Sequence, residues 1–524
     1  MEAGDRDSGV RLPEIVAAFS LASDLGLGQP MEHVLRSWLI AARLGDHLGL
    51  GTDERGALYY ASTLAWVGCV ADTPEVAAWF GDDIAFRSDY YKVDLAGLPM
   101  LGFMLSHVGA GSPALYRLRL GAKLVATGGR GIQRGLMSHC LTTARMAERF
   151  GLDEQVCQPL QQVFARWDGK GMPAGMSGEE IALPMRLFHL ADMVEVHHRT
   201  GGPDAAVAVA QAKRGKQFDP AVVDTFCPLA TEVLGDPAAE HDWPALIDAE
   251  PSLQRRLTEA ELDRALEAIA DFTDLRSAPR AGHSRAVADL AERAAIDLGL
   301  PPADVTAVRR AGLLHDLGMH AVPASILDKP TPLTAVEVER LRLHPYYTQR
   351  MLARPEALSR IGTIASAVRE RCDGSGYHRG LAGAGIPVTA RVLGAACAYR
   401  AMTEPRNHRP ALSAKQAVSA LRDDVRAGRL EPRAVDAVLA AAGQQRSGRR
   451  SGPAGLTPRE VEVLSLIARG ASTRQVAERL VISPKTAETH IERIYAKTGA
   501  TTRSTATLFA MQHGLLDSLD PLQM

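Results

Sequence analysis

Residues 456–499 read LTPREVEVLSLIARGASTRQVAERLVISPKTAETHIERIYAKTG, and this stretch decides the fold of the C-terminal part of the chain. Thr457-Pro458-Arg459-Glu460 supplies an N-cap hydroxyl, a proline at the first helical position and a glutamate that completes a capping box. Gly470 is a stop signal for that helix. Ser472 and Gln475 repeat the capping arrangement, so a second, shorter helix is expected to follow.

A third and a fourth helix complete this segment. Ser483-Pro484 opens the third helix and Gly499 closes it, and the fourth runs from about Thr502 to Gly514. Four short helices joined by short turns predict a compact helix-turn-helix unit. Residues 456–516 carry eight basic and five acidic side chains, a net charge of +3, which modestly favours a nucleic-acid partner.

Polar side chains gather on one face of the third helix. Ala487, Ile491 and Ile494 share the apolar face and should pack into the small core. The residues on or near the opposite face are Lys485, Thr486, Thr489 and Arg493. A recognition helix places such polar residues against base edges and its cations against phosphates. The pattern therefore predicts DNA contacts from this helix; the alternative is a small helical protein-binding module with the same caps.

The segment resembles the C-terminal helix-turn-helix of the LuxR family. The matching residues are 456–460, the helix start Ser483-Pro484-Lys485-Thr486, His490 and the helix end Lys497-Thr498-Gly499. The resemblance implies binding to promoter DNA as a homodimer. It adds Lys497 to Lys485, Thr486 and Thr489 as DNA contacts. Glu488 departs from the family, where a basic or neutral polar residue is more usual, and this leaves the phosphate contact near that position open.

Length and composition limit what the rest of the chain can be. The 524 residues suffice for about three domains, and a net charge of −2 with 23% charged residues excludes neither an enzyme nor a DNA binder. Six scattered cysteines without zinc-ribbon pairing predict reduced, mostly buried thiols. The charged residues 1–13 predict a flexible tail rather than a signal peptide. Residues 95–116 lack charges, but glycines and prolines favour buried or looped structure over a membrane span, so we expect a cytoplasmic protein.

The chain upstream of the helix-turn-helix repeats itself. His33 and His283 each begin a predicted helix that ends in Leu-Gly-Leu, at an offset of 250 residues. His139 and His344 correspond at an offset of 205 residues, as do several further pairs. Two coherent offsets in the same order predict a duplicated helical domain. The first copy then holds about 45 extra residues between Cys69 and His139.

The second copy carries the residues with metal-binding chemistry. His315 and Asp316 are adjacent in a predicted helix, His283 begins an earlier helix, and His344 can add a further ligand. Imidazole and carboxylate groups from separate helices can bind one divalent metal, whose bound water becomes a nucleophile for a phosphorus centre. The alternative is that the histidines lie on helix faces with ordinary hydrogen-bond partners while Asp316 pairs locally.

Together with Asp373-Gly374-Ser375-Gly376-Tyr377, the His315-Asp316 pair resembles the HD-GYP branch of the HD phosphohydrolase superfamily. The resemblance covers about 283–443, with a weaker echo over 33–226. Active members of that family use two or three metal ions to hydrolyse cyclic di-GMP. The resemblance therefore implies a helical fold around a metal-dependent phosphodiesterase site.

Several family residues are replaced in the second copy. Val368-Arg369 stands where the family has two adjacent histidines, and Met319 stands where it has a lysine that contacts the scissile phosphate. A metal-binding aspartate falls on Cys397, a second aspartate on Arg400, and the proline of the Gly-Tyr-Pro motif on His378. A second metal site is therefore not expected.

The first copy differs from the family in another way. It keeps His33, His139 and Asp192, but Ala65-Trp66 replaces the His-Asp pair and Val163-Phe164 replaces the paired histidines. Neither copy holds a full ligand set, so no catalytic residue is assigned. No cofactor is assigned; one divalent transition metal on His283, His315, Asp316 and His344, with Cys397 as a soft further ligand, is the open alternative.

The fold class predicted is all-α, with two tandem HD-like helical domains followed by a four-helix LuxR-type helix-turn-helix domain. The expected parts are a flexible tail (1–13), a first, degenerate HD-GYP-like domain (14–250), a connecting helix (251–275), a second HD-GYP-like domain (276–443), a basic flexible linker (444–455) and a LuxR-type DNA-binding domain (456–524). The apolar stripe of the connecting helix could equally be a dimerisation surface.

The function predicted is that of a transcription regulator that binds promoter DNA as a homodimer. Its HD-GYP-like region would be a non-catalytic sensory or dimerisation module with a nucleotide-like ligand and no membrane partner. The first alternative is a metal-dependent phosphohydrolase, a cyclic-dinucleotide phosphodiesterase with a DNA-binding domain. The second alternative is a protein-interaction scaffold without a small ligand.

Overall fold

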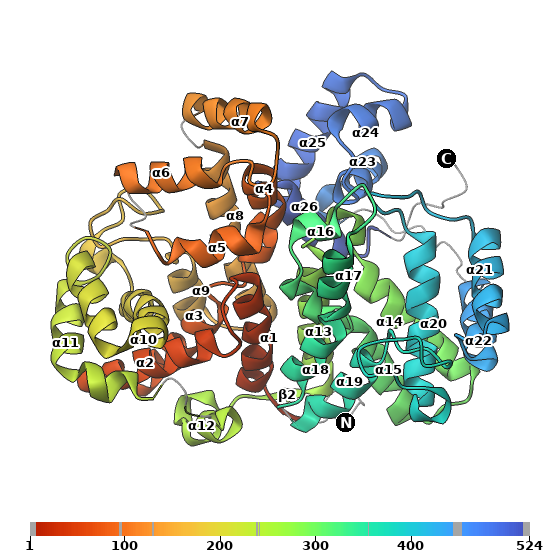
Figure 1. The fold of residues 1–524 in the computed structure, drawn as a ribbon, viewed down its shortest axis with the longest axis horizontal. Helices are drawn as coiled ribbons and strands as arrows, with labels where there is room; N and C mark the ends of the chain where they lie inside the picture. The colour runs from red at the N-terminus through yellow and green to blue at the C-terminus, as the bar shows by residue number, and fades with distance from the viewer. Residues whose placement is uncertain are drawn as a thin grey trace. The chain divides into compact units, whose positions relative to one another are not determined.

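The fold is built almost entirely from helices (Figure 1). A computed structural model describes residues 7–93, 97–127, 130–236, 239, 242–354, 356–443 and 453–516. It falls into two compact units, Met1–Ala265 and Leu266–Met524, and each is described by itself. The all-α prediction is confirmed, with two short strands as the exception among the described residues.

The first unit packs around one long helix. Its elements are β1 (Asp7–Arg11), α1 (Leu12–Gly26), α2 (His33–His47), α3 (Thr52–Leu64), α4 (Cys69–Phe80), α5 (Asp83–Tyr90), α6 (Gly97–His107), α7 (Ala114–Thr127), α8 (Arg130–Arg149), α9 (Glu154–Leu160), η2 (Gly178–Glu180), α10 (Leu183–Lys213), α11 (Pro220–Leu234), α12 (Trp243–Ala249), η3 (Pro251–Leu253) and β2 (Arg256–Thr258). Apolar residues of α2, α10 and α11 form one continuous core, and Gly202, at a φ of 80°, allows α10 to kink.

The two strands correct the sequence-based prediction at both ends of this unit. β1 pairs antiparallel with β2, and Leu12 and Pro13 are buried in α1, so residues 7–13 are not part of a flexible tail. Residues 1–6 lie outside the described residues. Likewise η3 and β2 occupy 251–258, so the predicted connecting helix begins only with α13 (Glu259–Asp274).

The extra residues of the first copy form helices. α5, α6 and α7 lie between Cys69 and His139, and several of their leucines face solvent, with Leu98 81% exposed and Leu118 70% exposed. The prediction of buried or looped structure for 95–116 is therefore wrong over α6, while residues 108–113 form turns as predicted. None of the described helices combines the length and the apolar character needed to cross a membrane.

The second unit contains the second copy and the C-terminal domain. Its elements after α13 are η4 (Ala278–Arg280), α14 (His283–Asp297), α15 (Pro302–Leu314), η5 (Leu317–Ala321), α16 (Ala324–Leu327), α17 (Ala335–Arg342), α18 (His344–Leu352), α19 (Glu356–Ser366), η6 (Gly383–Gly385), α20 (Val388–Thr403), α21 (Ala414–Arg426), α22 (Pro432–Gly443), η7 (Pro453–Gly455), α23 (Pro458–Ala468), α24 (Thr473–Leu480), α25 (Pro484–Thr498) and α26 (Arg503–Gln512). The boundary between the units falls inside α13, whose Asp274 accepts hydrogen bonds from Ser284 of α14.

The C-terminal domain has the four helices that its caps predict. Thr457, Ser472 and Ser483 each accept a backbone N–H bond at the start of their helix. Of the predicted apolar face of α25, Ala487 and Ile494 are fully buried, whereas Ile491 is half-buried. The predicted linker at 444–455 lies outside the described residues except for η7.

Candidate functional site

A buried cluster in the second copy contains the four predicted metal ligands. His283 begins α14 directly after Gly282, whose φ of 77° suits a glycine, and His344 begins α18. His315 and Asp316 lie where α15 ends and η5 begins, so the prediction that they lie within one helix is wrong. All four side chains are buried, with exposures of 1% or less.

The three histidines direct the same ring nitrogen, Nε2, towards the centre of this cluster. Each Nδ1 lies 2.7 Å from an oxygen that can only accept a hydrogen bond: Oε2 of Glu404 for His283, the carbonyl of Gly312 for His315 and the carbonyl of Leu341 for His344. Nδ1 must therefore carry the proton, which leaves the lone pair on Nε2. Among the described residues, no hydrogen bond reaches Nε2 of His283 or His344. Metal-binding histidines are oriented in this way.

The donor atoms lie at the spacing of ligands around one ion. An oxygen of Asp316 lies 3.2 Å from Nε2 of His315, and its oxygens lie 3.7 Å from Nε2 of His283 and of His344. Sγ of Cys397, on α20, lies 3.6 Å from Nε2 of His315. Ligand atoms about 2.1 Å from a tetrahedral metal are about 3.4 Å apart. The residues present therefore fit one divalent ion.

Burial keeps these histidines neutral. It lowers the pKa of His315 to about 3, and nearby Arg369 and Arg280 contribute in the same direction. Burial and Arg369 place the pKa of His344 well below its ordinary value, and burial lowers that of His283 although Glu404 opposes the shift. Because the neutral imidazole is the form that binds metals, the three side chains are ready as ligands at neutral pH.

Two positively charged arginines, Arg280 and Arg369, lie close to this cluster. The guanidinium of Arg280 forms an ion pair with Asp316, whose side chain is fully buried. Burial raises the pKa of the Cys397 thiol, but buried Arg369, with His283, more than offsets this and brings it down to about 6. Arg369 stands at a position where the family has a histidine. The side chains around Asp316 and Cys397 therefore include two guanidinium groups of the chain itself.

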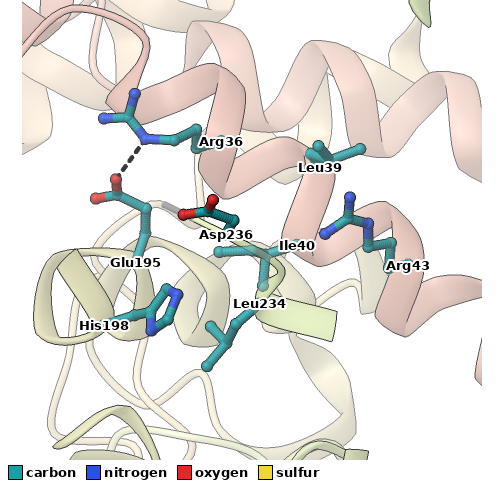
Figure 2. Close-up of a pocket in the computed structure, with 8 residues that line it drawn as sticks. All are labelled: Arg36, Leu39, Ile40, Arg43, Glu195, His198, Leu234 and Asp236. Atoms are coloured by element: carbon teal, nitrogen blue, oxygen red, sulfur yellow. Dashed lines mark hydrogen bonds and ion pairs between the residues drawn. The ribbon is translucent and has the colours of Figure 1, made fainter. Parts of the chain in front are cut away.

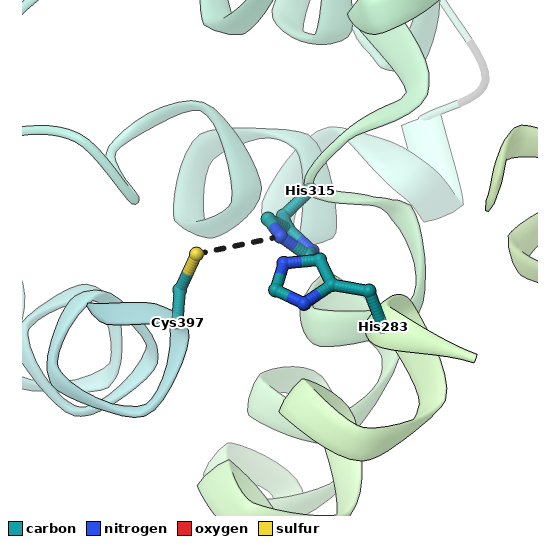
Figure 3. A group of neighbouring side chains, drawn as sticks. All are labelled: His283, His315 and Cys397. Atoms are coloured by element: carbon teal, nitrogen blue, oxygen red, sulfur yellow. Dashed lines mark hydrogen bonds between the residues drawn. The ribbon is translucent and has the colours of Figure 1, made fainter. Parts of the chain in front are cut away.

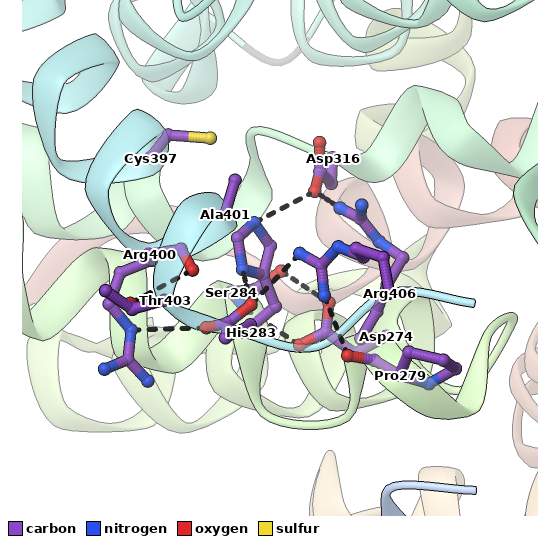
Figure 4. Close-up of polar contacts among 12 residues, drawn as sticks. Asp274, Pro279, His283, Ser284, Asp316, Cys397, Arg400, Ala401, Thr403 and Arg406 are labelled. Carbon is purple, nitrogen blue, oxygen red and sulfur yellow. Dashed lines mark hydrogen bonds and ion pairs between the residues drawn. The ribbon is translucent and has the colours of Figure 1, made fainter. Parts of the chain in front are cut away.

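Sequence reasoning missed Arg280 and Glu404, which pair with Asp316 and with Nδ1 of His283. Figure 4 shows polar contacts around His283, among them that of Arg406 with Pro279. Arg406 donates to the carbonyl of Pro279 and to Glu404, so the segment before His283 is fixed by a residue that follows it by more than 120 positions. No local pattern marks these partners, because the contacts are made by residues far apart in the chain. Met319, by contrast, is buried in an apolar cluster, as expected of a position that has lost its lysine.

The loop with the Asp-Gly motif closes against the same region. Glu370 accepts backbone hydrogen bonds of 2.8 Å from both Arg379 and Leu381, which fixes the loop. A Cβ on Gly376 would lie 2.4 Å from backbone atoms, so only glycine fits there. The ring of Tyr377 lies edge-on to His344, with centroids 6.2 Å apart. The loop is thus fixed by Glu370 and by the close approach at Gly376, and His378 follows Tyr377 where the motif has a proline.

In the first copy, side chains fill the corresponding site. His33 lies between two carboxylates, with Nδ1 at 2.5 Å from Glu195 and Nε2 at 3.1 Å from Asp192. Trp66, which replaces the aspartate of the His-Asp pair, donates its indole N–H to Asp192 at 2.9 Å, and the hydroxyl of Tyr91 lies 3.4 Å from the same carboxylate. Both ring nitrogens of His33 are therefore engaged, and no lone pair is left for a metal.

The ion pair between His33 and Glu195 keeps both side chains charged. Burial lowers the pKa of His33, but Glu195 and Asp192 outweigh it and raise the pKa to about 10. Burial raises the pKa of Glu195, but His33 and Arg36 outweigh it and lower the pKa to about 2. Beside Glu195 lies a cavity of about 20 Å³ (Figure 2), lined by Arg36, Leu39, Ile40, Arg43, Glu195, His198, Leu234 and Asp236. It has room for about one water molecule and is too small for a nucleotide.

His139 does not join His33. Its Nε2 donates to the carbonyl of Ala65 at 2.8 Å, and its ring packs edge-on against Trp66 and Phe164. Nδ1 lies 3.6 Å from a carboxylate oxygen of Asp72 on α4. The residue that the family would use as a ligand is therefore part of an aromatic cluster in this copy.

The predicted DNA-contacting residues meet on one face of α25. A surface hollow of about 280 Å³ is lined by Ser483, Lys485, Thr486, Thr489, His490 and Arg493. Lys485, Thr486 and Arg493 are exposed, while Thr489 donates its hydroxyl to the carbonyl of Lys485. The polar face is thus open to a nucleic acid, and its contacts with DNA remain a prediction.

Lys497 is placed differently. Its Nζ lies 2.7 Å from a carboxylate oxygen of Glu460 and 3.0 Å from the carbonyl of Gly455. Glu460 belongs to the capping box of α23, so Lys497 connects the end of α25 to that cap. The structure thereby gives Lys497 a stabilising partner within the domain, which the sequence did not reveal.

A buried histidine-aspartate cluster between helices, followed by a four-helix domain of the helix-turn-helix type, defines a class of proteins that joins an HD domain to a helix-turn-helix domain. The HD domain model matches residues 134–222 and 267–433, and the model of the bacterial regulatory proteins of the luxR family matches residues 454–510. The chain therefore carries HD-domain sequence in both copies and a C-terminal luxR-family domain, which confirms both resemblances.

The relatives of the HD region are phosphodiesterases. The chain is 27% identical to 3′3′-cGAMP-specific phosphodiesterase 3 of Vibrio cholerae over 418 residues, which cover 79% of this chain and 91% of that protein. It is 32% identical over 197 residues to the cyclic di-GMP phosphodiesterase response regulator RpfG of Xanthomonas campestris, covering 36% of this chain and 52% of that protein. The crystal structure of a cyclic GMP-AMP specific phosphodiesterase from V. cholerae shares the fold, with a TM-score of 0.59, 24% identity, and coverage of 83% of this chain and 98% of that chain.

Proposed function

We propose that this protein is a DNA-binding transcription regulator whose HD-GYP-like region is a non-catalytic sensory or dimerisation module. The observation that carries this proposal is the ion pair between Arg280 and Asp316. The carboxylate of Asp316, at the centre of the buried cluster, thereby has a guanidinium partner from the chain itself. A hydrolytic site needs that carboxylate for its metal, since metal ions stabilise the charge that develops in phosphoryl transfer.

The residues around the buried cluster support the proposal that the protein does not hydrolyse cyclic dinucleotides. Arg369 and Cys397 stand at positions where the family has metal ligands, and Met319 stands in place of the cation that contacts the phosphate. A two-metal site uses one ion for the attacking oxygen and one for the leaving oxygen. With one possible ion and no lysine, most of the stabilisation of the transition state would be lost.

The first copy supports a sensory or dimerisation role for the whole helical region. Its metal position is closed by the bonds of His33, Trp66 and Tyr91 to Asp192, yet the helical framework is kept. A cyclic dinucleotide is the ligand class we propose, because a relative matched over 91% of its length is named a 3′3′-cGAMP-specific phosphodiesterase. Ligand binding would alter the geometry of a homodimer and so its affinity for promoter DNA.

DNA binding is assigned to the polar face of α25. Lys485 and Arg493 supply cations, and Thr486 and Thr489 supply hydroxyls, around one surface hollow. Such a face suits base edges in the major groove and the adjoining phosphates. Two copies on a two-fold-related site would explain how a domain with a modest positive charge achieves specific binding.

The experiment that tests this assignment measures affinity for a DNA site selected from a random duplex library. Lys485→Ala and Arg493→Ala should weaken binding at least tenfold and reduce the salt dependence by about one counterion each. Lys415→Ala, which removes an exposed cation from α21, is the matched control. Equal losses in all three variants would contradict the assignment to α25.

The second candidate function is a metal-dependent cyclic-dinucleotide phosphodiesterase. It is favoured by the three neutral histidines that direct Nε2 towards the centre of the buried cluster and by the names of the relatives. Residues His283, His315, Asp316 and His344 would hold the ion, which when bound supplies Lewis acidity and a more acidic water. Product released from a cyclic dinucleotide by the wild type, and not by His315→Ala, would establish this function.

A further inference from the structure

Three side chains of the second copy form a donor set that differs from that of a phosphodiesterase. Nε2 or Nδ1 of His283 and His315 and Sγ of Cys397 all lie within 4.8 Å of one another (Figure 3). They come from α14, the end of α15 and α20, so the tertiary fold alone brings them together. All three are buried, with exposures of 1% or less, so the site is shielded from water.

The donors are held in the geometry that a metal requires. The Nδ1–H groups of His283 and His315 are fixed by Glu404 and by the carbonyl of Gly312, so both Nε2 lone pairs point inward. Nε2 of His283, Nε2 of His344 and Oδ1 of Asp316 are buried without a hydrogen bond among the described residues, while Oδ2 of Asp316 pairs with Arg280. Buried polar atoms are normally satisfied, so several unsatisfied atoms around one point indicate a missing partner.

The sulfur decides which kind of ion fits. Thiolate and imidazole donors bind zinc-class ions, whereas oxygen donors suit manganese and magnesium. Two imidazoles and one thiolate leave a fourth position of a tetrahedral site. Asp316 is within reach of that position, but Arg280 already pairs with it.

We propose that the second copy binds one thiophilic divalent ion of the zinc class through His283, His315 and Cys397, and that Arg280 limits the affinity by holding Asp316. The ion and the guanidinium are alternative partners of the same carboxylate. Arg280 lies on η4, three residues before His283, so its ion pair with Asp316 links the turn that leads into α14 to the metal site. The further step, in which the bound ion acts as a signal to the helical region, rests on the proposed regulatory function.

The test uses full-length protein stripped of metal with a chelator and titrated with Co²⁺, a spectroscopic probe for zinc sites. We expect one Co²⁺ per chain with a thiolate-to-cobalt charge-transfer band in the near ultraviolet, and displacement of Co²⁺ by Zn²⁺. Cys397→Ser should abolish the band. Cys372→Ser, a half-buried cysteine of the same domain, is the control and should keep it. Absence of the band from the wild type, or its persistence in Cys397→Ser, would overturn the proposal.

Two further variants keep the test decisive if Cys397→Ser folds poorly. Cys397→Asp replaces the soft donor by a hard one, and should shift the preference between Zn²⁺ and Mn²⁺ at least tenfold towards Mn²⁺. Arg280→Gln should tighten Zn²⁺ binding at least tenfold, because Asp316 is released. An unchanged preference between Zn²⁺ and Mn²⁺ in Cys397→Asp would overturn the assignment of Cys397 as a ligand. An unchanged Zn²⁺ affinity in Arg280→Gln would overturn the role given to Arg280.

The experiments distinguish a failure of the metal-site proposal from a failure of the DNA-binding assignment. If apo protein and protein loaded with Zn²⁺ bind the selected DNA site equally, the ion is no signal, although the Co²⁺ spectrum still establishes the site. If no metal binds while Lys485→Ala still weakens DNA binding, the metal site is refuted and the DNA-binding assignment stands.

Discussion

The replacement of Trp66 by phenylalanine tests whether the closed site of the first copy stabilises the fold. Trp66 is only 6% exposed, and its indole N–H donates to Asp192 at 2.9 Å. Its ring packs edge-on against Tyr90 and against Phe164, and a phenyl ring can also pack there. Trp66→Phe therefore removes one hydrogen bond to a buried carboxylate and a modest part of the ring surface.

The size of the effect follows from these contacts. A hydrogen bond to a charged group contributes about 1.5 to 3 kcal/mol, and the lost ring area contributes about 1 kcal/mol. Asp192 keeps its contact with His33 at 3.1 Å, so the carboxylate is not left without a partner. We expect Trp66→Phe to lower the free energy of unfolding by about 3 kcal/mol.

The assay is urea unfolding followed by far-ultraviolet circular dichroism. Trp38→Phe is the matched control, because Trp38 is buried to a similar extent, with 4% exposure, and packs edge-on against Tyr59. The control should cost about 1 kcal/mol. In a cycle with Asp192→Asn, Trp66→Phe should show a coupling of about 1.5 kcal/mol or more. Equal costs for the two tryptophans, or no coupling, would refute the reasoning.

Three further predictions concern other parts of the chain. The pKa of His33 is raised to about 10 from an ordinary value near 6.5, so its stabilisation is complete below about pH 6.5 and is lost as the pH rises towards 10. The difference in unfolding free energy between wild type and His33→Gln should therefore shrink over that range, and a constant difference would contradict the ion pair. Lys497→Met removes Nζ from Glu460, 2.7 Å away, and should destabilise the C-terminal domain by about 1 kcal/mol in thermal unfolding, whereas an unchanged midpoint would speak against this contact. Gly376→Ala places a Cβ 2.4 Å from backbone atoms and should cost about 2 kcal/mol or more, whereas Gly385→Ala, which meets open space, should be neutral; equal stabilities of the two variants would argue against the close approach.

Local signals predicted the helical framework well. The caps at Thr457, Ser472 and Ser483 act within four residues, so the sequence contains all that is needed to place those helix starts. The repeat also aligned His33 with His283, and both begin helices in the structure. The helix-turn-helix and the duplicated helical domain could therefore be predicted without a structure.

Long-range partners could not be predicted in this way. β1 and β2 are short strands about 250 residues apart, and nothing in five or three residues indicates that they pair. The ion pair of Arg280 with Asp316 and the bond of Trp66 to Asp192 depend on tertiary packing of distant helices. The break between α15 and η5 was missed because the apolar pattern continues across it. The charges that decide the chemistry of both sites thus come from contacts that only the folded chain creates.

The most direct test of the central claim is a turnover assay. Full-length protein would be incubated with 3′3′-cGAMP and with cyclic di-GMP in the presence of Mn²⁺, Fe²⁺ or Zn²⁺, and linear products would be measured beside the His315→Ala variant. The account predicts no product above the level of that variant, because Arg280 already pairs with Asp316, Arg369 stands at a ligand position and Met319 stands in place of a lysine. Product formed by the wild type and lost in His315→Ala would contradict the account and identify the protein as a phosphodiesterase.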